Sequence, residues 1–231
     1  SPAAPACRPQ SSPPDRSLYR RAYCAEASMI DQVVSAVVDT IGREYVQVEV
    51  SARHVHLSQA DLEKLFGRGT TLTPKRELSQ PGQFLSEQRV TLVGPKGRKE
   101  NVSVLGPVRK ATQVELSKSD ARGLGVKAPL RESGDVAGSG SITLEGPKGS
   151  ITIPEGVIVA HCHIHMTNAD ARRMGVADNQ HVSVEIGGER PVVFKDVIVR
   201  VSDKYRCRMH IDTDEGNATT LGKLPLGRVI K

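Results

Sequence analysis

The chain has 231 residues, enough for one large or two small domains, and its formal net charge of +6 suits anionic ligands. Aromatic residues make up only 3% and Trp is missing, so base-stacking surfaces are not expected and nucleic acid is excluded as a partner. No apolar run approaches the roughly 20 residues of a membrane helix, and none of the four cysteines forms a C-x-x-C pair, which favours a cytoplasmic protein with no membrane partner.

The N-terminal part divides into two segments. Residues 1–27 are rich in Pro, Ser, Arg and Ala and are predicted to be a disordered tail, with Met29 as a natural start. A helix is predicted over residues 28–43, from a capping-box-like start at Ser28 and Asp31 to a stop at Gly42. Its apolar residues share one face, which leaves two interpretations open: packing on its own domain, or docking as an amphipathic peptide on another protein.

From Tyr45 onward the hydrophobic period changes to two, which indicates β-strands with one buried face. Turn sequences such as residues 94–97 (GPKG) and 146–149 (GPKG) separate the apolar segments. Many short strands at this spacing predict a mainly β fold of the barrel or sandwich type. Short strands are predicted at Tyr45–Ser51, Val90–Val93, Val102–Leu105, Ile142–Leu144, Ile151–Ile153, Val157–Val159, Val182–Ile186, Val192–Phe194 and Val197–Val201.

An internal repeat is the most informative feature of this region. Residues 54–61 (HVHLSQAD), 113–120 (QVELSKSD) and 163–170 (HIHMTNAD) share one pattern. In a strand the two polar residues that flank a β-branched one face the same side, and the following Ser or Thr can cap a helix. Each repeat is therefore predicted to be a strand that ends in a capped helix and presents two polar groups just before the cap.

Most of the presented groups can bind a metal. The presented residues are His54 and His56, Gln113 and Glu115, and His163 and His165, and five of these six can be ligands. His210 lies in another strand-like alternation, and of the seven histidines only His181 lies outside these clusters. Imidazole together with a carboxylate favours zinc, and the number of ligands exceeds one tetrahedral shell, so two ions bridged by Glu115 are expected.

Four stretches resemble the PduL-type phosphate propanoyltransferases, the phosphotransacylases of bacterial microcompartments. They are residues 48–58 (VEVSARHVHLS), 109–117 (RKATQVELS), 163–166 (HIHM) and 210–218 (HIDTDEGNA). The resemblance implies a mainly β fold of two β-barrel domains with short capping helices, one inserted in the other. The first barrel would comprise residues 45–52 plus 160–231, and the inserted barrel residues 53–159.

The resemblance also implies a site and a reaction. The enzyme would interconvert acyl-CoA (propanoyl-CoA or acetyl-CoA) plus phosphate with acyl phosphate plus coenzyme A. The implied site has three parts: a dinuclear zinc centre held by His54, His56, Glu115, His163, His165 and His210, a phosphate-binding Arg109, and Ser51 and Asn217 near the coenzyme A thiol. The helix at residues 28–43 would dock on a microcompartment shell protein or other cargo, so the chain would work inside a bacterial microcompartment in the cytoplasm. A homo-oligomer is compatible with this interpretation.

Two other functions are kept as alternatives. A zinc-dependent thioester hydrolase would use the same histidines with water in place of phosphate, and a non-catalytic shell-associated protein would use zinc only to stabilise the fold. The chain also departs from the family pattern at His161 and Cys162, where basic residues are usual. Cys162 could be an extra ligand, a redox-sensitive thiol or a small packing residue, and we favour the last. No Ser-His-Asp or other Cys-His arrangement indicates an acyl-enzyme, so direct attack by phosphate is expected.

Overall fold

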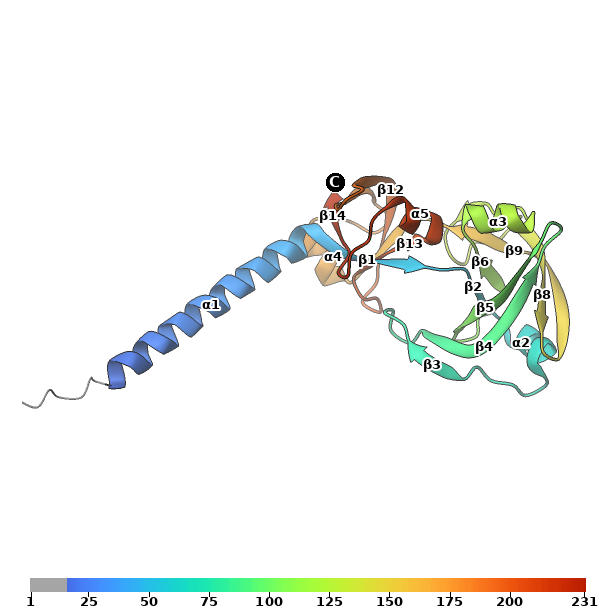
Figure 1. Cartoon of the computed structure of the whole chain (residues 1–231), viewed down its shortest axis with the longest axis horizontal. Helices are drawn as coiled ribbons and strands as arrows, with labels where there is room; N and C mark the ends of the chain where they lie inside the picture. The colour runs from blue at the N-terminus through green and yellow to red at the C-terminus, as the bar shows by residue number, and fades with distance from the viewer. Residues whose placement is uncertain (1–15) are drawn as a thin grey trace, which may run out of the picture. The chain divides into compact units, whose positions relative to one another are not determined.

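The computed structural model describes residues 16–231, with side chains from residue 29 onward, and it separates into the units Ser1–Ile41 and Gly42–Lys231. Helix α1 spans Arg16–Glu44 (Figure 1). Ser28 therefore lies inside the helix and is not its N-cap, and residues 16–27 of the predicted tail belong to the same helix. The reason is composition, because the Ala, Arg, Leu and Glu residues before Ser28 are strong helix formers. The rest of the predicted tail, residues 1–15, lies outside the described residues.

The apolar face of α1 remains in contact with solvent. Val34 and Val37 are 54% and 50% exposed, far above the value for a packed core residue. The large apolar side chains that share this exposure are Met29, Ile30, Val33, Val34, Val37, Val38 and Ile41. An exposed apolar stripe of this length is typical of an interaction surface.

The first barrel is built from strands at the two ends of the second unit. Its ring order is β1-β13-β10-β12-β11-β14, and it is closed. Figure 1 labels β1, β12, β13 and β14 of this barrel. The ring closes because β14, at the C-terminal end, pairs with both β1 and β11. The strands are β1 (Tyr45–Ser51), β10 (His163–Met166), β11 (His181–Ile186), β12 (Val192–Val201), β13 (Arg208–Asp212) and β14 (Leu226–Ile230).

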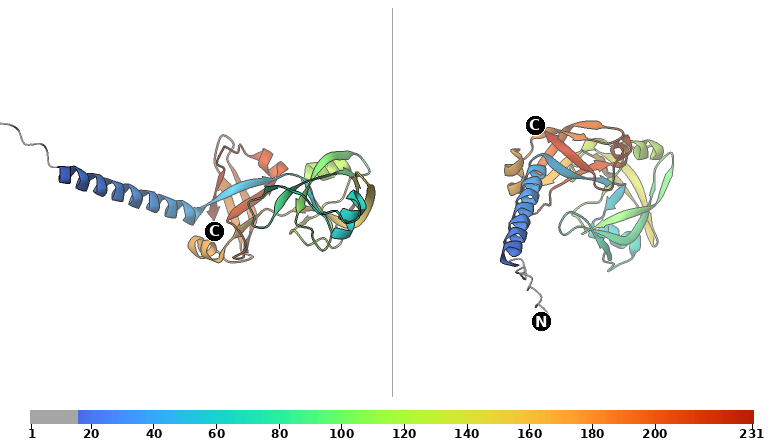
Figure 2. Two further views of the ribbon diagram at one scale, coloured as in Figure 1. Left: turned by 90° about the horizontal axis from the view of Figure 1, so that it is seen from below. Right: turned by 60° about the vertical axis from the view of Figure 1, so that its left-hand side comes forward.

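The second barrel uses the strands that lie between β1 and β10 in the chain. Its pairings run β4-β5-β2-β6-β9, and β8 closes the ring by pairing with both β4 and β9. Figure 2 shows the strands of both barrels curving around their interiors. The mainly β fold with one barrel inserted in the other is thus confirmed. The strands are β2 (His54–His56), β4 (Phe84–Val93), β5 (Arg98–Gly106), β6 (Gln113–Glu115), β8 (Gly140–Gly146) and β9 (Gly149–Ala160), extended by β3 (Pro74–Glu77) and β7 (Leu130–Arg131).

Two pairs of predicted strands are each one continuous strand. β9 joins the predicted Ile151–Ile153 and Val157–Val159, and β12 joins Val192–Phe194 and Val197–Val201. The residues between them, Gly156 and Asp196, have φ angles of +137° and +61°. Such residues bend a strand at a bulge without ending its pairing, so a sequence pattern that marks them as breaks divides the strand wrongly.

Each barrel has its own apolar core made of aliphatic side chains. The inserted barrel is filled by residues such as Leu57, Leu92 and Val114, and the first barrel by residues such as Ile164 and Met209. The alternate residues of the same strands face away from these cores. Because the strand period is two, an aliphatic residue in the core fixes the direction of its polar neighbours.

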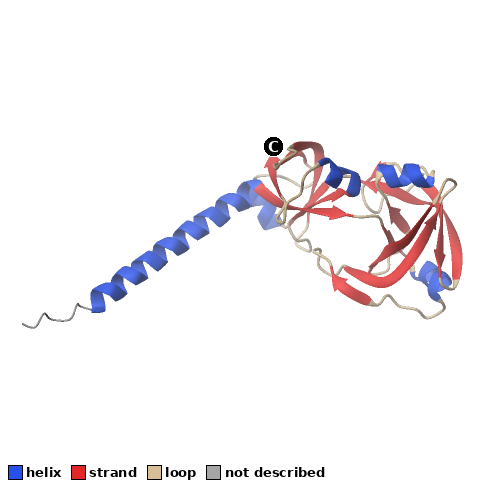
Figure 3. Cartoon of the chain, viewed as in Figure 1, coloured by secondary structure: helices blue, strands red, loops and turns tan. Residues whose placement is uncertain are grey.

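The helices outside α1 are short and follow strand ends, as Figure 3 shows. They are α2 (Gln59–Phe66), α3 (Lys118–Leu124), α4 (Asn168–Met174) and α5 (Thr213–Ala218). The predicted caps are confirmed, since Ser58, Ser117 and Thr167 each accept a hydrogen bond from the backbone N–H three residues later. None of the helices that the structure describes is both long and apolar enough to cross a membrane.

Candidate metal centre

Strand pairing brings the polar residues of the repeats together. In the inserted barrel β2 and β6 are antiparallel, with His54 opposite Glu115 and His56 opposite Gln113. In the first barrel β10 and β13 are antiparallel, with His163 opposite His210. Antiparallel partners on one face have side chains within reach of each other, so each barrel places a cluster of polar groups on its surface.

The partner strand β13 is a fourth member of the repeat that the sequence analysis missed. Residues 208–215 (RMHIDTDE) form a strand followed by an N-cap at Asp212, with Glu215 completing a capping box. His210 therefore occupies the same place in its repeat as Glu115 does. The signal was present in the alternation Arg208-Met209-His210-Ile211, but Asp in place of Ser or Thr at the cap obscured it.

The first ligand group consists of His54, His56 and Glu115. Their ligand atoms lie within 4.8 Å of one another. The Glu115 carboxylate is 3.4 Å from Nε2 of His54 and 3.9 Å from Nε2 of His56. Burial alone would raise the pKa of Glu115, but His54 and His56 outweigh it and hold the pKa well below its ordinary value. Glu115 is therefore an anion at neutral pH.

The second ligand group consists of His163, His165 and His210, again within 4.8 Å of one another. Burial, followed by the neighbouring His163, lowers the pKa of His165 to about 2 and that of His210 to about 3. These imidazoles are consequently neutral at pH 7, which is the form that binds a metal. Three imidazoles with an open fourth position are typical of catalytic zinc sites.

The hydrogen bonds of the rings test whether these residues fit a metal. Nδ1 of His54 bonds the carbonyl of Ala52 at 2.9 Å, and Nδ1 of His163 bonds that of His161 at 2.7 Å. Because a carbonyl only accepts, each ring in its neutral form carries the proton on Nδ1 and has its lone pair on Nε2. Nε2 of His54 then faces the Glu115 oxygen, an arrangement of two acceptors that a cation or a proton must separate.

A buried polar atom in the second group supports the same conclusion. Nδ1 of His165 is buried and, among the described residues, has no hydrogen-bond partner. Buried nitrogens of this kind are uncommon in native structures and need a ligand, a water or an ion. The residues therefore fit metal ions in both groups.

Both groups line one cavity of about 710 Å³, which suits a ligand of cofactor size. Several polar residues of its lining were not predicted from the sequence, namely Glu49, Gln80, Ser133, Arg200 and Tyr205. Gln113 and Ser133 donate hydrogen bonds of 2.6 and 2.8 Å to Glu115 and so orient it. Gln80 bonds the backbone of Arg206 from both ends of its amide and lies 3.3 Å from Nε2 of His210. These residues come from strands and loops that are distant along the chain and meet only in the folded structure.

The remaining predicted site residues lie in different places. Arg109 and Ser51 line the cavity, whereas Asn217 is exposed on α5 and is not part of the cavity lining. Arg109 donates a 3.0 Å hydrogen bond to Ser133. The pKa of Arg109 is lowered, chiefly by burial and also by the charge of Arg200, while Glu115 acts in the opposite direction. Arg109 is thus a half-buried cation beside both a carboxylate and a second guanidinium.

The chain is similar to a family of known enzymes over most of its length. The family model of phosphate propanoyltransferase matches residues 47–222. The chain belongs to the phosphate propanoyltransferase family. It is 45% identical to the phosphate propanoyltransferase of Clostridioides difficile over 88% of this chain and 98% of that protein. It is 53% identical to that of Thermotoga maritima over 75% of this chain and 83% of that protein. The chain is therefore an acyltransferase.

Cys162 is a packing residue of the first barrel. Cys162 is 6% exposed and contributes to the core of the first barrel. Burial raises the pKa of its thiol, and the charges of Glu215 and Asp212 add to this effect. A thiol held protonated in an apolar core is a poor nucleophile.

Proposed function

We propose that this phosphate propanoyltransferase family member transfers an acyl group between coenzyme A and inorganic phosphate at a dinuclear zinc centre. His54, His56 and Glu115 would hold one ion, and His163, His165 and His210 the other, with Glu115 as a bridge. The observation that carries the proposal is that both ligand groups line one cavity. Zinc fits a donor set of neutral imidazoles and one carboxylate without a redox-active ligand.

Phosphate binding is assigned to Arg109. A guanidinium grips a phosphate through two parallel hydrogen bonds, and partial burial strengthens such bonds. Arg200 lines the same cavity and its charge acts on Arg109. Two guanidiniums would balance the charge of phosphate and of the coenzyme A thiolate that leaves.

Coenzyme A would approach from the end of β1. Ser51 lines the cavity there and would lie near the thiol, and Asn217 on the neighbouring α5 is assigned the same role. The names of the relatives favour a propanoyl group. Acetyl would also react, because a pocket separates acyl groups that differ by one methylene by only about 1–3 kcal/mol.

The reaction proceeds by direct displacement. A phosphate oxygen held by Arg109 attacks the thioester carbonyl, a C–O bond forms, the C–S bond breaks, and coenzyme A leaves as the thiolate. When bound, zinc supplies Lewis-acid polarisation of the carbonyl and stabilisation of negative charge. Holding both substrates side by side can lower the barrier by about 7–11 kcal/mol. The protonated thiol of Cys162 offers no competing covalent route.

Localisation is assigned through α1. Its exposed apolar face would dock on a shell protein or other cargo of a bacterial microcompartment, which would concentrate the enzyme near its acyl-CoA supply.

The test is the release of coenzyme A from propanoyl-CoA with and without phosphate, before and after chelation and the return of zinc. We expect release that requires phosphate, disappears on chelation and returns with zinc. Equal release without phosphate would instead indicate the thioester hydrolase. A folded, zinc-loaded protein that releases no coenzyme A in either condition would support the non-catalytic alternative.

A further inference from the structure

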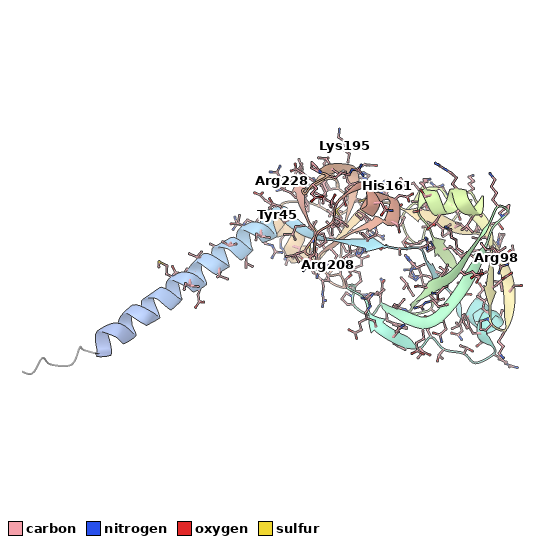
Figure 4. The ribbon with its side chains drawn as sticks, viewed as in Figure 1. Tyr45, Arg98, His161, Lys195, Arg208 and Arg228 are labelled. Atoms are coloured by element: carbon pink, nitrogen blue, oxygen red, sulfur yellow. The ribbon has the colours of Figure 1, made fainter. Side chains whose placement is uncertain are left out.

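A further cluster of two histidines and one aspartate lies at the surface of the first barrel. The carboxylate of Asp196 on β12 is 2.5 Å from Nδ1 of His181 on β11 and 3.2 Å from Nε2 of His161. The two rings meet edge to face, with centroids 6.5 Å apart. Figure 4 labels His161 and Lys195, the residue before Asp196 on β12. Two imidazoles from distant points of the chain thus converge on the two oxygens of one carboxylate.

The ring of His161 is oriented with Nε2 toward Asp196. Nδ1 of His161 lies 3.1 Å from the carbonyl oxygen of Cys162, which can only accept a hydrogen bond. In the neutral ring the proton is therefore on Nδ1, and the lone pair of Nε2 points at a carboxylate oxygen. Nε2 of His161 and an oxygen of Asp196, 3.2 Å apart, are two potential ligand atoms for one cation.

The backbone at Asp196 aims the carboxylate. Its φ of +61° is uncommon for a residue other than glycine, although Asp and Asn adopt it more readily than most. The pairing of β11 with β12 shifts register between Val182 and Val184, so that β12 carries the extra residue of a bulge around Asp196. Bulges commonly redirect a side chain next to a functional site.

The cluster is open to ions from solution. The side chains of Asp196 and His181 are 63% and 54% exposed, so both can move to admit an ion, while His161 at 16% is held in place. We propose that His161, Asp196 and His181 form a further site for a divalent cation of the zinc class, separate from the six cavity ligands. Two imidazoles and a carboxylate with a free position for water are a sufficient ligand set for zinc.

This site would lie at the edge of the catalytic cavity. His161 belongs to the cavity lining, although its Nε2 is directed to Asp196. His161 also precedes His163 by two residues, and its carbonyl oxygen accepts the Nδ1–H that fixes the tautomer of His163. An ion held by His161 would thus stiffen the segment that orients a cavity ligand.

The test counts zinc ions on the full-length protein after its cavity metals are loaded and excess metal is removed. Zinc is then added alone, and bound zinc is measured by equilibrium dialysis with elemental analysis. We expect the wild-type chain to bind one equivalent more than His181→Ala and Asp196→Asn. Asn tolerates positive φ, so the second variant keeps the bulge. Glu185→Gln, which removes an exposed carboxylate from the same strand β11, is the control and is expected to bind as the wild type does.

The comparison between variants does not depend on how many ions the cavity holds. Equal zinc stoichiometry in the wild type and both variants would overturn the proposal. An extra equivalent of bound zinc that is lost in His181→Ala but kept in Asp196→Asn would also overturn the proposal, because a lone surface histidine would then account for the binding. A zinc-induced shift of the His181 imidazole NMR signals in the wild type, missing in Asp196→Asn, is the second expected readout.

Discussion

Arg109 is the side chain whose geometry the proposed reaction uses most directly. Its backbone is fixed by a 2.9 Å hydrogen bond to the carbonyl of Leu57, and its guanidinium by Ser133. In Arg109→Lys the charge remains but the planar fork is lost. We expect the KM for phosphate to rise by about 10- to 100-fold, since a lost charge-assisted hydrogen bond is worth roughly 1.5–3 kcal/mol.

Initial rates as a function of phosphate concentration check this prediction. The control is Arg122→Lys, a matched substitution at an exposed position of α3, which is expected to leave the KM unchanged. An unaltered KM for phosphate in Arg109→Lys would show that phosphate binds elsewhere in the cavity. In that case Arg200 would be the next residue to replace.

Single residues also show what the sequence could reveal about the site. His54, His56, Glu115, His163 and His165 could be named as candidate ligands because the repeat places them on one face of a strand. Residues such as Gln80 and Arg200 could not, because their sequence neighbourhoods carry no motif. They reach the cavity only through pairings between strands that are distant along the chain, and a one-dimensional pattern does not specify those pairings.

The fold contains four copies of a unit made of a strand, an N-cap and a helix. In one copy the acidic residue of the first helical turn forms ion pairs with other elements. In α2, α4 and α5 the acidic residue of the first turn bonds its own cap. Asp120 in α3 instead holds Arg53 at 2.6 Å and Lys99 at 3.1 Å, and its side chain is only 8% exposed. This residue ties α3 to the segment before β2 and to β5.

The ion pairs of Asp120 predict an effect on acid stability. Burial would raise the pKa of Asp120, but Arg53 and Lys99 outweigh it and the pKa is lowered. The unfolded chain therefore binds more protons near and below pH 4, and the stabilisation is present above that pH and lost as the pH falls through it. At pH 7, Asp120→Asn is expected to lower the free energy of unfolding by about 1–3 kcal/mol. The difference from wild type should shrink below pH 4.

Urea unfolding of the metal-free proteins between pH 3 and 7 measures this effect. Asp135→Asn is the control, because Asp135 is 57% exposed and its pair with Arg131 is 3.5 Å long, so its effect should stay within about 0.5 kcal/mol. A difference between Asp120→Asn and wild type that is the same at pH 3 and pH 7 would mean that packing, and not charge, accounts for it.

The whole molecule repeats one arrangement in both barrels. In the first, β1 lies parallel to β13, which is antiparallel to β10, which is parallel to β12. In the second, β5, β2, β6 and β9 follow the same sequence of pairings. The repeat could be read from the sequence, but the closure of each ring could not. Closure depends on β14 and β8, whose apolar patterns resemble those of any short strand.

Substitutions on the exposed apolar face of α1 test whether this helix binds the protein to a microcompartment shell. In a full-length chain with Val34→Glu and Val37→Glu, two charges lie on the exposed apolar face. We expect co-sedimentation with isolated microcompartment shells to be lost while kcat stays within about two-fold, because none of the described residues that line the cavity lies on α1. The matched control, Gln32→Glu with Ser35→Glu, adds the same two charges to the opposite helical face and should sediment as wild type does. If both double variants sediment equally with the shells, the apolar face is not the docking surface, and if both lose turnover, the helix contributes to catalysis.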